Sequence, residues 1–151
     1  MQMNSHTKAQ RHEEEKGSAF SGVEPRENVI AKEAVDAAFH IHSELGPGLL
    51  ESVYEVVLAH ELRSRGFELE RQRPIELKYK GIHFQEGFRA DLWIENKVLV
   101  EVKSVDELAP VHSKQVLTYL RLTGLILGLL INFGAPYIRD GIERIINGRL
   151  E

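Results

Sequence analysis

The most constraining feature of this sequence is a nearly continuous apolar run near its carboxyl end, LILGLLINF at residues 125–133. The run has the length of a β-strand and is too short to cross a bilayer, which takes about 20 apolar residues in a helix. A strand that is apolar at almost every position, rather than at alternate positions, is typical of a strand buried on both faces. We therefore expect a sheet with helices packed against it.

Apolar residues at helical spacing predict two helices before the sheet. The first begins near Glu24 and ends at Gly46, and the second runs from about 49 to 65 and ends at Gly66. We expect the apolar residues of these helices to lie on their inner faces. These are Val29, Ala34, Val35, Ala38 and Phe39 in the first helix and Leu50, Val53, Val57, Leu58 and Leu62 in the second.

The pattern changes to alternation over residues 67–103, which predicts three strands or strand pairs with turns near 80–81 and 95–97. Helical spacing returns over 110–124, and GIERIING at 141–148 predicts a short strand or a turn of helix. The predicted order is ααβββαβ. This order describes an α/β protein in an α+β arrangement, with a mixed central sheet flanked by helices.

Composition bounds the class of protein. A chain of 151 residues with 42% hydrophobic and 28% charged residues is ordinary for one globular domain, expected over 25–151 after a polar, disordered tail at 1–24. The absence of cysteine excludes disulfides, thiolate metal sites and a cysteine nucleophile. The amino terminus lacks the apolar core of a signal peptide, so a cytoplasmic location and no membrane association are expected.

The charge of the chain gives no global argument for nucleic-acid binding, because the formal net charge is −4. A local excess of three positive charges lies between Arg63 and Lys80. Two explanations of that excess stay open. It is either a solvated surface of mixed charge or a track that contacts phosphates.

The segment RADLWIENKVLVEVKS, residues 89–104, places charges among the apolar residues of two predicted strands. Side chains alternate between the faces of a strand, so the apolar sets of both strands share one face only if the turn at 95–97 has three residues. The apolar sets are Phe88, Ala90, Leu92 and Ile94, then Val98, Val100 and Val102. That register places Asp91 directly opposite Glu101. Adjacent carboxylates repel each other, so either Arg89 and Lys103 neutralise them on a solvent face, or a metal ion does.

The second predicted helix carries a carboxylate on its apolar side. Glu51 lies on one row with Tyr54, Leu58 and Leu62, at offsets of three, seven and eleven residues. A buried carboxylate is costly unless it is paired or binds a cation. The alternative is a boundary position from which the carboxylate reaches water.

The later helix carries Gln115 and Tyr119 one turn apart on one face, preceded by His112 and Lys114. By themselves these four residues indicate no more than the polar edge of a helix. A functional role for these residues would need support from other features of the chain.

Several stretches together resemble a known family. GLLESVY, 48–54, has the G-x-x-E-x-x-Y pattern of the GxxExxY proteins, a branch of the PD-(D/E)XK nuclease superfamily. The stretches YKG, FRADLWIENKVLVEVKSV, PVHSKQVLTYL and GLLINFG follow in the order and spacing of that family. The resemblance covers residues 28–147 and implies a restriction-endonuclease-like αβββαβ core, with one acidic residue on a helix and a D…E-x-K set on a strand hairpin.

The resemblance also implies roles for individual residues. Glu51 looks like the helical acid, Asp91 and Glu101 look like metal-binding carboxylates, and Lys103 looks like the catalytic lysine. The backbone carbonyl of Val102 is a further expected metal ligand. One departure is that Arg-Ala, rather than a proline, precedes the aspartate, at a position that is loose across the superfamily.

Further residues are expected to contact nucleic acid. Gln115 and Tyr119 resemble the Q-x-x-x-Y element of helicase-associated exonucleases, which lies beside the active site. Trp93 is predicted on the face of Asp91, where it either stacks on a base or simply belongs to the core. Arg89 and Lys114 are the expected basic contacts.

The function that the resemblance implies is hydrolysis of phosphodiester bonds by a nuclease that uses Mg²⁺ or Mn²⁺, with DNA as the expected substrate. Lys103 would orient the attacking water or stabilise charge at phosphorus, because an ordinary ammonium is a poor base. Two alternatives stay open. The chain is a catalytically silent nuclease-fold module that binds nucleic acid or a protein, or its acid cluster is purely structural. Monomer and homodimer are both open.

Overall fold

The computed structural model describes residues 22–84 and 87–150 of the chain. The predicted disordered tail lies almost wholly outside these residues. Within the described residues, no helix is both long and apolar enough to cross a membrane.

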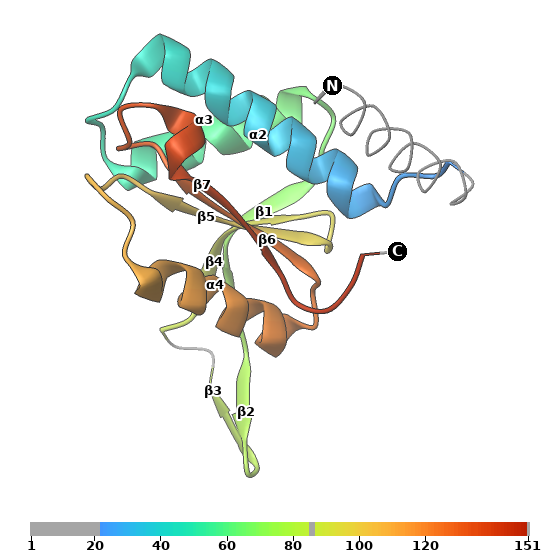
Figure 1. Ribbon diagram of the computed structural model, residues 1–151. Helices are drawn as coiled ribbons and strands as arrows, with labels where there is room; N and C mark the ends of the chain where they lie inside the picture. The colour runs from blue at the N-terminus through green and yellow to red at the C-terminus, as the bar shows by residue number, and fades with distance from the viewer. Residues whose placement is uncertain (1–21, 85–86, 151) are drawn as a thin grey trace, which may run out of the picture.

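A five-stranded mixed sheet forms the centre of the fold (Figure 1). In their order across the sheet, the strands are β1 (Leu69–Pro74), β4 (Arg89–Ile94), β5 (Val98–Lys103), β6 (Leu127–Asn132) and β7 (Ile142–Ile146). Only β5 and β6 pair in parallel among the described strands; the other neighbours are antiparallel. The parallel pair needs a crossover connection, which helix α4 (Pro110–Thr123) supplies.

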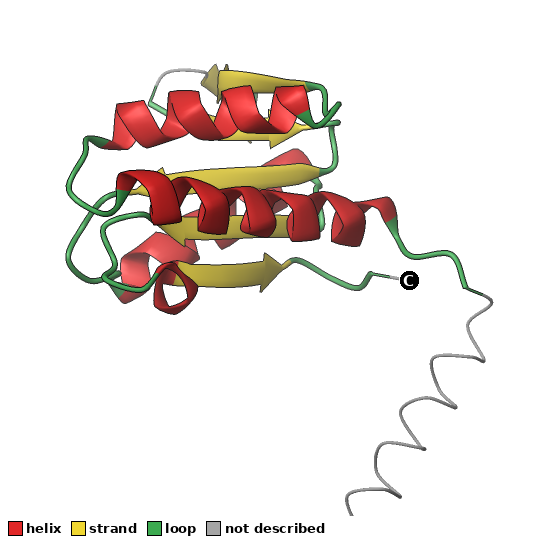
Figure 2. Ribbon diagram, turned by 90° about the horizontal axis from the view of Figure 1, so that it is seen from above, coloured by secondary structure: helices red, strands yellow, loops and turns green. Residues whose placement is uncertain are grey.

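Helices cover both faces of the sheet. Helices α2 (Arg26–Leu45) and α3 (Glu51–Ser64) lie on one side, and α4 lies on the other (Figure 1). Seen from above, α2 runs along the direction of the strands (Figure 2). Strand β6 is buried at every position, which confirms the prediction of a strand covered on both faces. The predicted mixed sheet flanked by helices is also confirmed; the helices and the strands of this sheet follow the predicted order ααβββαβ, and the segment predicted as a short strand or a turn of helix adds β7 after β6.

Two apolar cores result, one on each face. The core under α2 and α3 packs small alanines and larger residues of the helices against alternate residues of the strands, and its centre includes Ala34, Ala38, Leu58, Leu62, Leu92, Val100 and Leu129. The core under α4 is smaller and includes Ala90, Trp93, Leu99, Val116, Tyr119, Leu120 and Leu130. The sheet is thus fixed between two layers of helix.

The inner faces of α2 and α3 differ in part from the prediction. Phe39 and Val53 are exposed, and Leu50 is 74% exposed because it precedes the first turn of α3 instead of lying within it. Alanines and isoleucines line the inner face of α2, since small side chains allow the two helices to approach the sheet closely.

A separate hairpin interrupts the path between β1 and β4. Its strands are β2 (Leu77–Tyr79) and β3 (Ile82–Phe84), which pair only with each other. The hairpin projects from the body of the domain below α4 (Figure 1). At the carboxyl end of the chain, a short 3-10 helix η1 (Ile138–Gly141) leads into β7.

Candidate active site

The β4–β5 hairpin has the predicted register. Its turn consists of residues 95–97, and Leu92 pairs with Val100. One step further along the same register, Asp91 and Glu101 lie opposite each other. The alternating pattern of apolar residues therefore fixed which carboxylates meet.

Regular backbone pairing between β4 and β5 stops at these two acids, and side chains take its place. The N–H of Asp91 donates to Oε1 of Glu101 over 3.2 Å, and the N–H of Val102 donates to Oδ2 of Asp91 over 2.8 Å. Each carboxylate is thereby held by the backbone of the neighbouring strand. The strands diverge around two acids that are fixed in position.

Burial makes Glu101 the more unusual of the two acids. Its side chain belongs to the buried residues, with 5% of its surface exposed. Burial, together with the negative charge of Asp91, raises the pKa of Glu101 to about 9, and the positive charge of Lys103 opposes this rise. A cation beside the pair would favour the ionised form of both carboxylates.

A third acid, Glu55 of α3, lies beside Asp91. Glu55 is buried and accepts hydrogen bonds from the guanidinium of Arg71, 2.8 Å from Nη2, and from the amide of Gln72. Burial raises the pKa of Glu55, the hydrogen bond from Arg71 lowers it, and the negative charge of Asp91 raises it further. The helix therefore does contribute an acid to this region, one turn later than expected.

Glu51, the acid chosen from the sequence, is exposed at the first position of α3. The sequence contained a signal for Glu55 that was missed. Glu55 precedes Leu58, Ala59 and Leu62 by three, four and seven residues, and all three are fully buried.

The tyrosine of the heptad 48–54 stabilises the fold. Tyr54 is buried and stacks on Phe133, with ring centroids 4.5 Å apart. Its hydroxyl donates to the carbonyl of Gly46 and accepts the N–H of Leu49 at 3.2 Å. The conformation of this loop requires glycine at Gly48, where φ is 110°. The heptad thus fixes the loop that leads into α3.

Gln72 joins the acids of helix and sheet. It lies opposite Asp91 in the β1–β4 register, between two regular pairs, and its φ of 53° is in the left-handed region. Its Nε2 donates to Oδ1 of Asp91 over 3.0 Å as well as to Glu55. Arg89 donates to the carbonyl oxygen of Gln72 over 3.1 Å, which holds the kink in β1 from the other side. No sequence pattern indicated this residue.

At the start of β4, the side chains project to a different face from the one predicted. Phe88 and Ala90 were predicted on the face of Leu92 and Ile94, but they pack with the residues under α4. Regular pairing is interrupted at Asp91 toward both neighbouring strands, so the simple alternation of faces does not continue through it. The segment before Asp91 is turned toward α4 for this reason.

Helix α4 brings two of the four residues that the sequence singled out into this region. Tyr119 is buried, and its hydroxyl accepts a hydrogen bond from Nε2 of Gln115 over 2.9 Å. Burial and then the negative charge of Glu101 raise the pKa of Tyr119. His112 instead accepts the N–H of Ala109 at the start of the helix, and Lys114 is exposed. Tyr119 thus lies near the carboxylate pair, and Gln115 is linked to it by a hydrogen bond.

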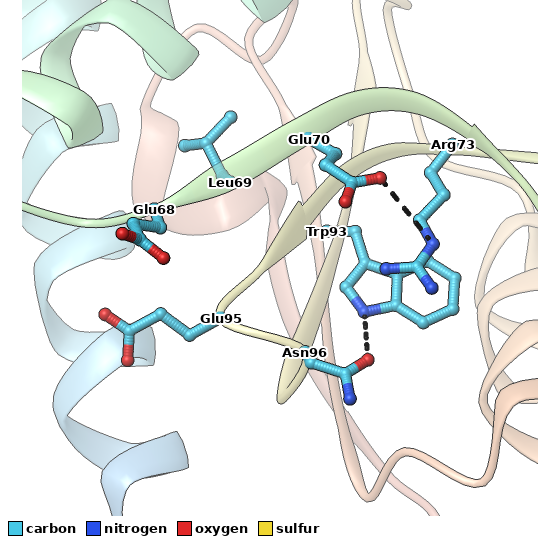
Figure 3. A pocket seen from close by; sticks show the side chains of 7 residues that line it. All are labelled: Glu68, Leu69, Glu70, Arg73, Trp93, Glu95 and Asn96. Carbon is cyan, nitrogen blue, oxygen red and sulfur yellow. Dashed lines mark hydrogen bonds and ion pairs between the residues drawn. The ribbon is translucent and has the colours of Figure 1, made fainter.

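Trp93 lies further along β4, beneath a cation (Figure 3). Only 8% of its surface is exposed, and the guanidinium carbon of Arg73 lies 3.8 Å from the centroid of its ring. The indole N–H donates to Oδ1 of Asn96 over 3.0 Å. Arg73, rather than the face of the indole, is therefore the group that this part of the sheet presents to solvent.

The carboxylate groups around Asp91 are suitable ligands for a hard divalent cation. All are oxygens, and carboxylate oxygens are the ligands that Mg²⁺ and Mn²⁺ prefer. In residues 22–84 and 87–150, however, no three acidic or histidine side chains converge closely enough to enclose an ion. The pair formed by Asp91 and Glu101 is the centre of the site, and Glu55 is linked to it through Gln72.

The chain resembles known proteins over most of its length. A family model described as the PD-(D/E)XK nuclease superfamily matches residues 28–145. A solved structure described as "Crystal structure of SSO0001" is 27% identical, with 67% of this chain and 52% of that chain covered and a TM-score of 0.46. The chain thus spans about half the length of that protein. A search of the curated proteins found no match.

Proposed function

The chain belongs to the PD-(D/E)XK nuclease superfamily, and we propose that it is an active, metal-dependent nuclease that hydrolyses phosphodiester bonds in DNA. The observation that carries this proposal is the pair of Asp91 and Glu101, held opposite each other by the backbones of two neighbouring strands. The heptad 48–54 further supports a place in the GxxExxY branch of the superfamily.

Asp91 and Glu101 would hold Mg²⁺ or Mn²⁺, with the backbone carbonyl of Val102 as a further oxygen donor. When bound, such a cation offsets the charge of the phosphate and lowers the pKa of a water molecule. We assign the role of the helical acid to Glu55, because it is buried beside Asp91 while Glu51 is exposed. Glu51, first expected in that role, would act only through water.

Lys103 would orient the attacking water and stabilise the charge that develops on the phosphate oxygens. It follows Glu101 by two residues on the same strand, so both side chains project to one face. Its positive charge already opposes the rise in the pKa of Glu101. An ammonium in this place acts by its charge and its hydrogen bonds.

The remaining site residues would hold the nucleic-acid strand. Tyr119 keeps its hydroxyl proton because its pKa is raised, so it can donate to a phosphate oxygen while Gln115 fixes its position. Arg89 and Lys114 are exposed and basic, which suits contacts to the backbone of the strand. Arg73 covers the ring of Trp93, so Arg73 would contact the nucleic acid there and Trp93 would support it.

The test is incubation of the protein with single-stranded DNA, double-stranded DNA and RNA in Mg²⁺, Mn²⁺ or EDTA. We expect cutting of DNA with metal and none with EDTA. Asp91→Asn and Lys103→Met should abolish cutting, while Glu107→Gln and Lys97→Met, at exposed positions, should leave it unchanged. Metal-dependent cutting that survives Asp91→Asn would come from a contaminant and would refute the proposal.

A second candidate is a catalytically silent module that binds nucleic acid or a protein partner. It is favoured by the lack of a three-acid cluster that could enclose an ion within residues 22–84 and 87–150. This candidate predicts binding of DNA without turnover in any metal, and binding that is unaffected by Glu101→Gln. Calorimetric titration with Mn²⁺ separates the two candidates, since an active site requires Mn²⁺ binding that Asp91→Asn removes.

A further inference from the structure

The β2–β3 hairpin carries one wholly apolar face. Leu77 pairs with Phe84 and Tyr79 pairs with Ile82, so the four side chains project to the same side. Tyr79, Ile82 and Phe84 are 59%, 52% and 39% exposed. The opposite side carries the pair of Lys78 and His83, and His83 contacts Glu76. Polar groups therefore occupy one face of the hairpin and exposed apolar groups the other.

An exposed apolar face on a free hairpin is unusual. A two-stranded sheet is marginally stable in water, and clusters of exposed apolar side chains usually mark a binding surface. The hairpin pairs with no strand of the central sheet, and it projects away from the body of the domain (Figure 1). Its apolar residues thus add nothing to either core, and a ligand would explain their exposure.

In the sequence, the hairpin lies between two strands of the candidate active site. It is inserted between β1, which carries Gln72, and β4, which carries Asp91. The N–H of Ile75 donates to the carbonyl of Phe88 over 2.8 Å, which joins the two legs at their base. A polymer that enters the site along β4 would therefore pass the hairpin.

The charge of this part of the sequence suits a polyanion. Residues 71–89 contain five basic and two acidic residues; Arg71 and Arg73 pair with Glu55 and Glu70, which leaves Lys78, Lys80 and Arg89 as the basic residues of the hairpin and its base. Arg89 opens β4 next to the site, and Lys80 lies at the tip of the hairpin, 5.4 Å from the centroid of the Tyr79 ring. Positive charge thus lies at both ends of the apolar face, at its tip and at its base.

We propose that the apolar face of the β2–β3 hairpin binds unpaired bases of the nucleic-acid strand that enters the active site. Tyr79 and Phe84 stack on bases, while Lys80 and Arg89 contact phosphates. Stacking requires bases that are not paired, so the preferred ligand is single-stranded nucleic acid or a single-stranded overhang. This inference rests on the proposed function, because it names how the same site receives its substrate.

Fluorescence anisotropy of labelled oligonucleotides tests the hairpin apart from catalysis. The full chain carries Asp91→Asn, which prevents cutting, and is titrated into a single strand and into a blunt duplex of the same sequence. Tyr79→Ala and Phe84→Ala should each weaken binding of the single strand about fivefold or more, as expected for one stacked base. Tyr137→Ala is the matched control, since Tyr137 is 69% exposed next to η1 and far along the chain from the hairpin.

The outcomes are distinct. Single-strand binding that Tyr79→Ala and Phe84→Ala leave equal to the Tyr137→Ala control overturns the role of the hairpin and leaves the proposed function standing. No binding of any oligonucleotide by the parent protein overturns both. An equal loss on the blunt duplex excludes base stacking. A change from dimer to monomer in sedimentation of the Tyr79→Ala protein would show that the face joins two copies of the chain, which also refutes the proposal.

Discussion

The two faces of strand β5 are buried to nearly the same extent, yet they hold different kinds of side chain. Val98, Val100 and Val102 pack against the core under α2 and α3. On the other face, Leu99 is followed by Glu101 and Lys103, and Glu101 is as well buried as the apolar residues around it. The same alternation that builds the core therefore places a carboxylate inside the protein.

The carboxylate lies where the pairing of the backbone changes along the strand. From Val98 to Val100, β4 and β5 pair regularly. Where Glu101 lies, the pairing is replaced by hydrogen bonds from backbone N–H groups to Asp91 and Glu101. Such bonds offset part of the cost of burying the acids, although the raised pKa of Glu101 indicates that the cost is not fully met. The face with the valines therefore stabilises the fold, whereas the face with Glu101 is less stable and carries the candidate site.

The largest effect should come from the charged face. Asp91→Asn keeps the size of the side chain but removes half of the carboxylate pair, and we expect cleavage to fall about a thousandfold or more, equivalent to ~4 kcal/mol of activation free energy. The free energy of unfolding in EDTA should fall by no more than about 1–2 kcal/mol, because the amide has one acceptor oxygen where the carboxylate offers two, to Gln72 and to the N–H of Val102. Single-turnover cleavage and urea unfolding measure the two quantities. A large loss of stability would instead assign Asp91 a structural role.

A substitution at the neighbouring Leu92 should lower stability and leave cleavage almost unchanged. Leu92 is fully buried on the valine face, so Leu92→Ala should lower the free energy of unfolding by about 2–5 kcal/mol. Cleavage per folded molecule should change little at a temperature where the variant is folded. Urea unfolding and active-site titration check this. A specific loss of cleavage without loss of stability would mean that the two faces are not separate in function.

Much of this contrast was readable from the sequence, because the patterns that encode it are local. The continuous run of β6 and the alternation of β4 and β5 fixed the sheet, its burial and the meeting of Asp91 with Glu101. The choice between Glu51 and Glu55 was harder, since both acids lie near buried residues of α3. The row of Leu58 and Leu62 fits Glu55 better, and only the position of the helix start shows that Glu51 is exposed.

Other features have no local signature. Gln72 has a left-handed backbone, which glutamine rarely adopts, so no pattern predicts this conformation or the shift of Ala90 toward α4. The cover of Trp93 by Arg73 depends on the pairing of β1 with β4, which alternation alone does not specify. Contacts between strands that are distant in sequence therefore account for most of what was missed.

The third prediction concerns the pH dependence of stability in EDTA. The pKa of Glu101 is about 9 in the folded protein against an ordinary value of 4.5, so the folded state keeps a proton that the unfolded state releases. Stability should therefore fall as the pH rises from about 4.5 toward 9. Glu101→Gln resembles the protonated acid and should be more stable than the parent by on the order of 1–3 kcal/mol at pH 8, with no difference at pH 4.

Thermal or urea unfolding of both proteins across this pH range measures the effect. Glu143→Gln, at an exposed position of β7, is the control: it keeps Glu101, so its stability should follow that of the parent across the pH range. A Glu101→Gln protein that is less stable than the parent at pH 8 would show that the carboxylate is ionised and stabilising in the metal-free protein.

The smallest effects on cleavage and stability should come from substitutions of Gln72. Two variants separate the role of its side-chain amide, which links Asp91 and Glu55, from the strain of its left-handed backbone. Gln72→Ala and Gln72→Gly both remove the amide that donates to Asp91 and Glu55, so both should raise the Mn²⁺ concentration needed for half-maximal cleavage by the same few-fold factor. The glycine variant tolerates a φ of 53°, whereas alanine does not, and it should be more stable by about 1 kcal/mol. Equal stability of the two variants would mean that β1 relaxes once the amide is gone, so that the hydrogen bonds to the acids, and not the packing of β1 on β4, hold the kink.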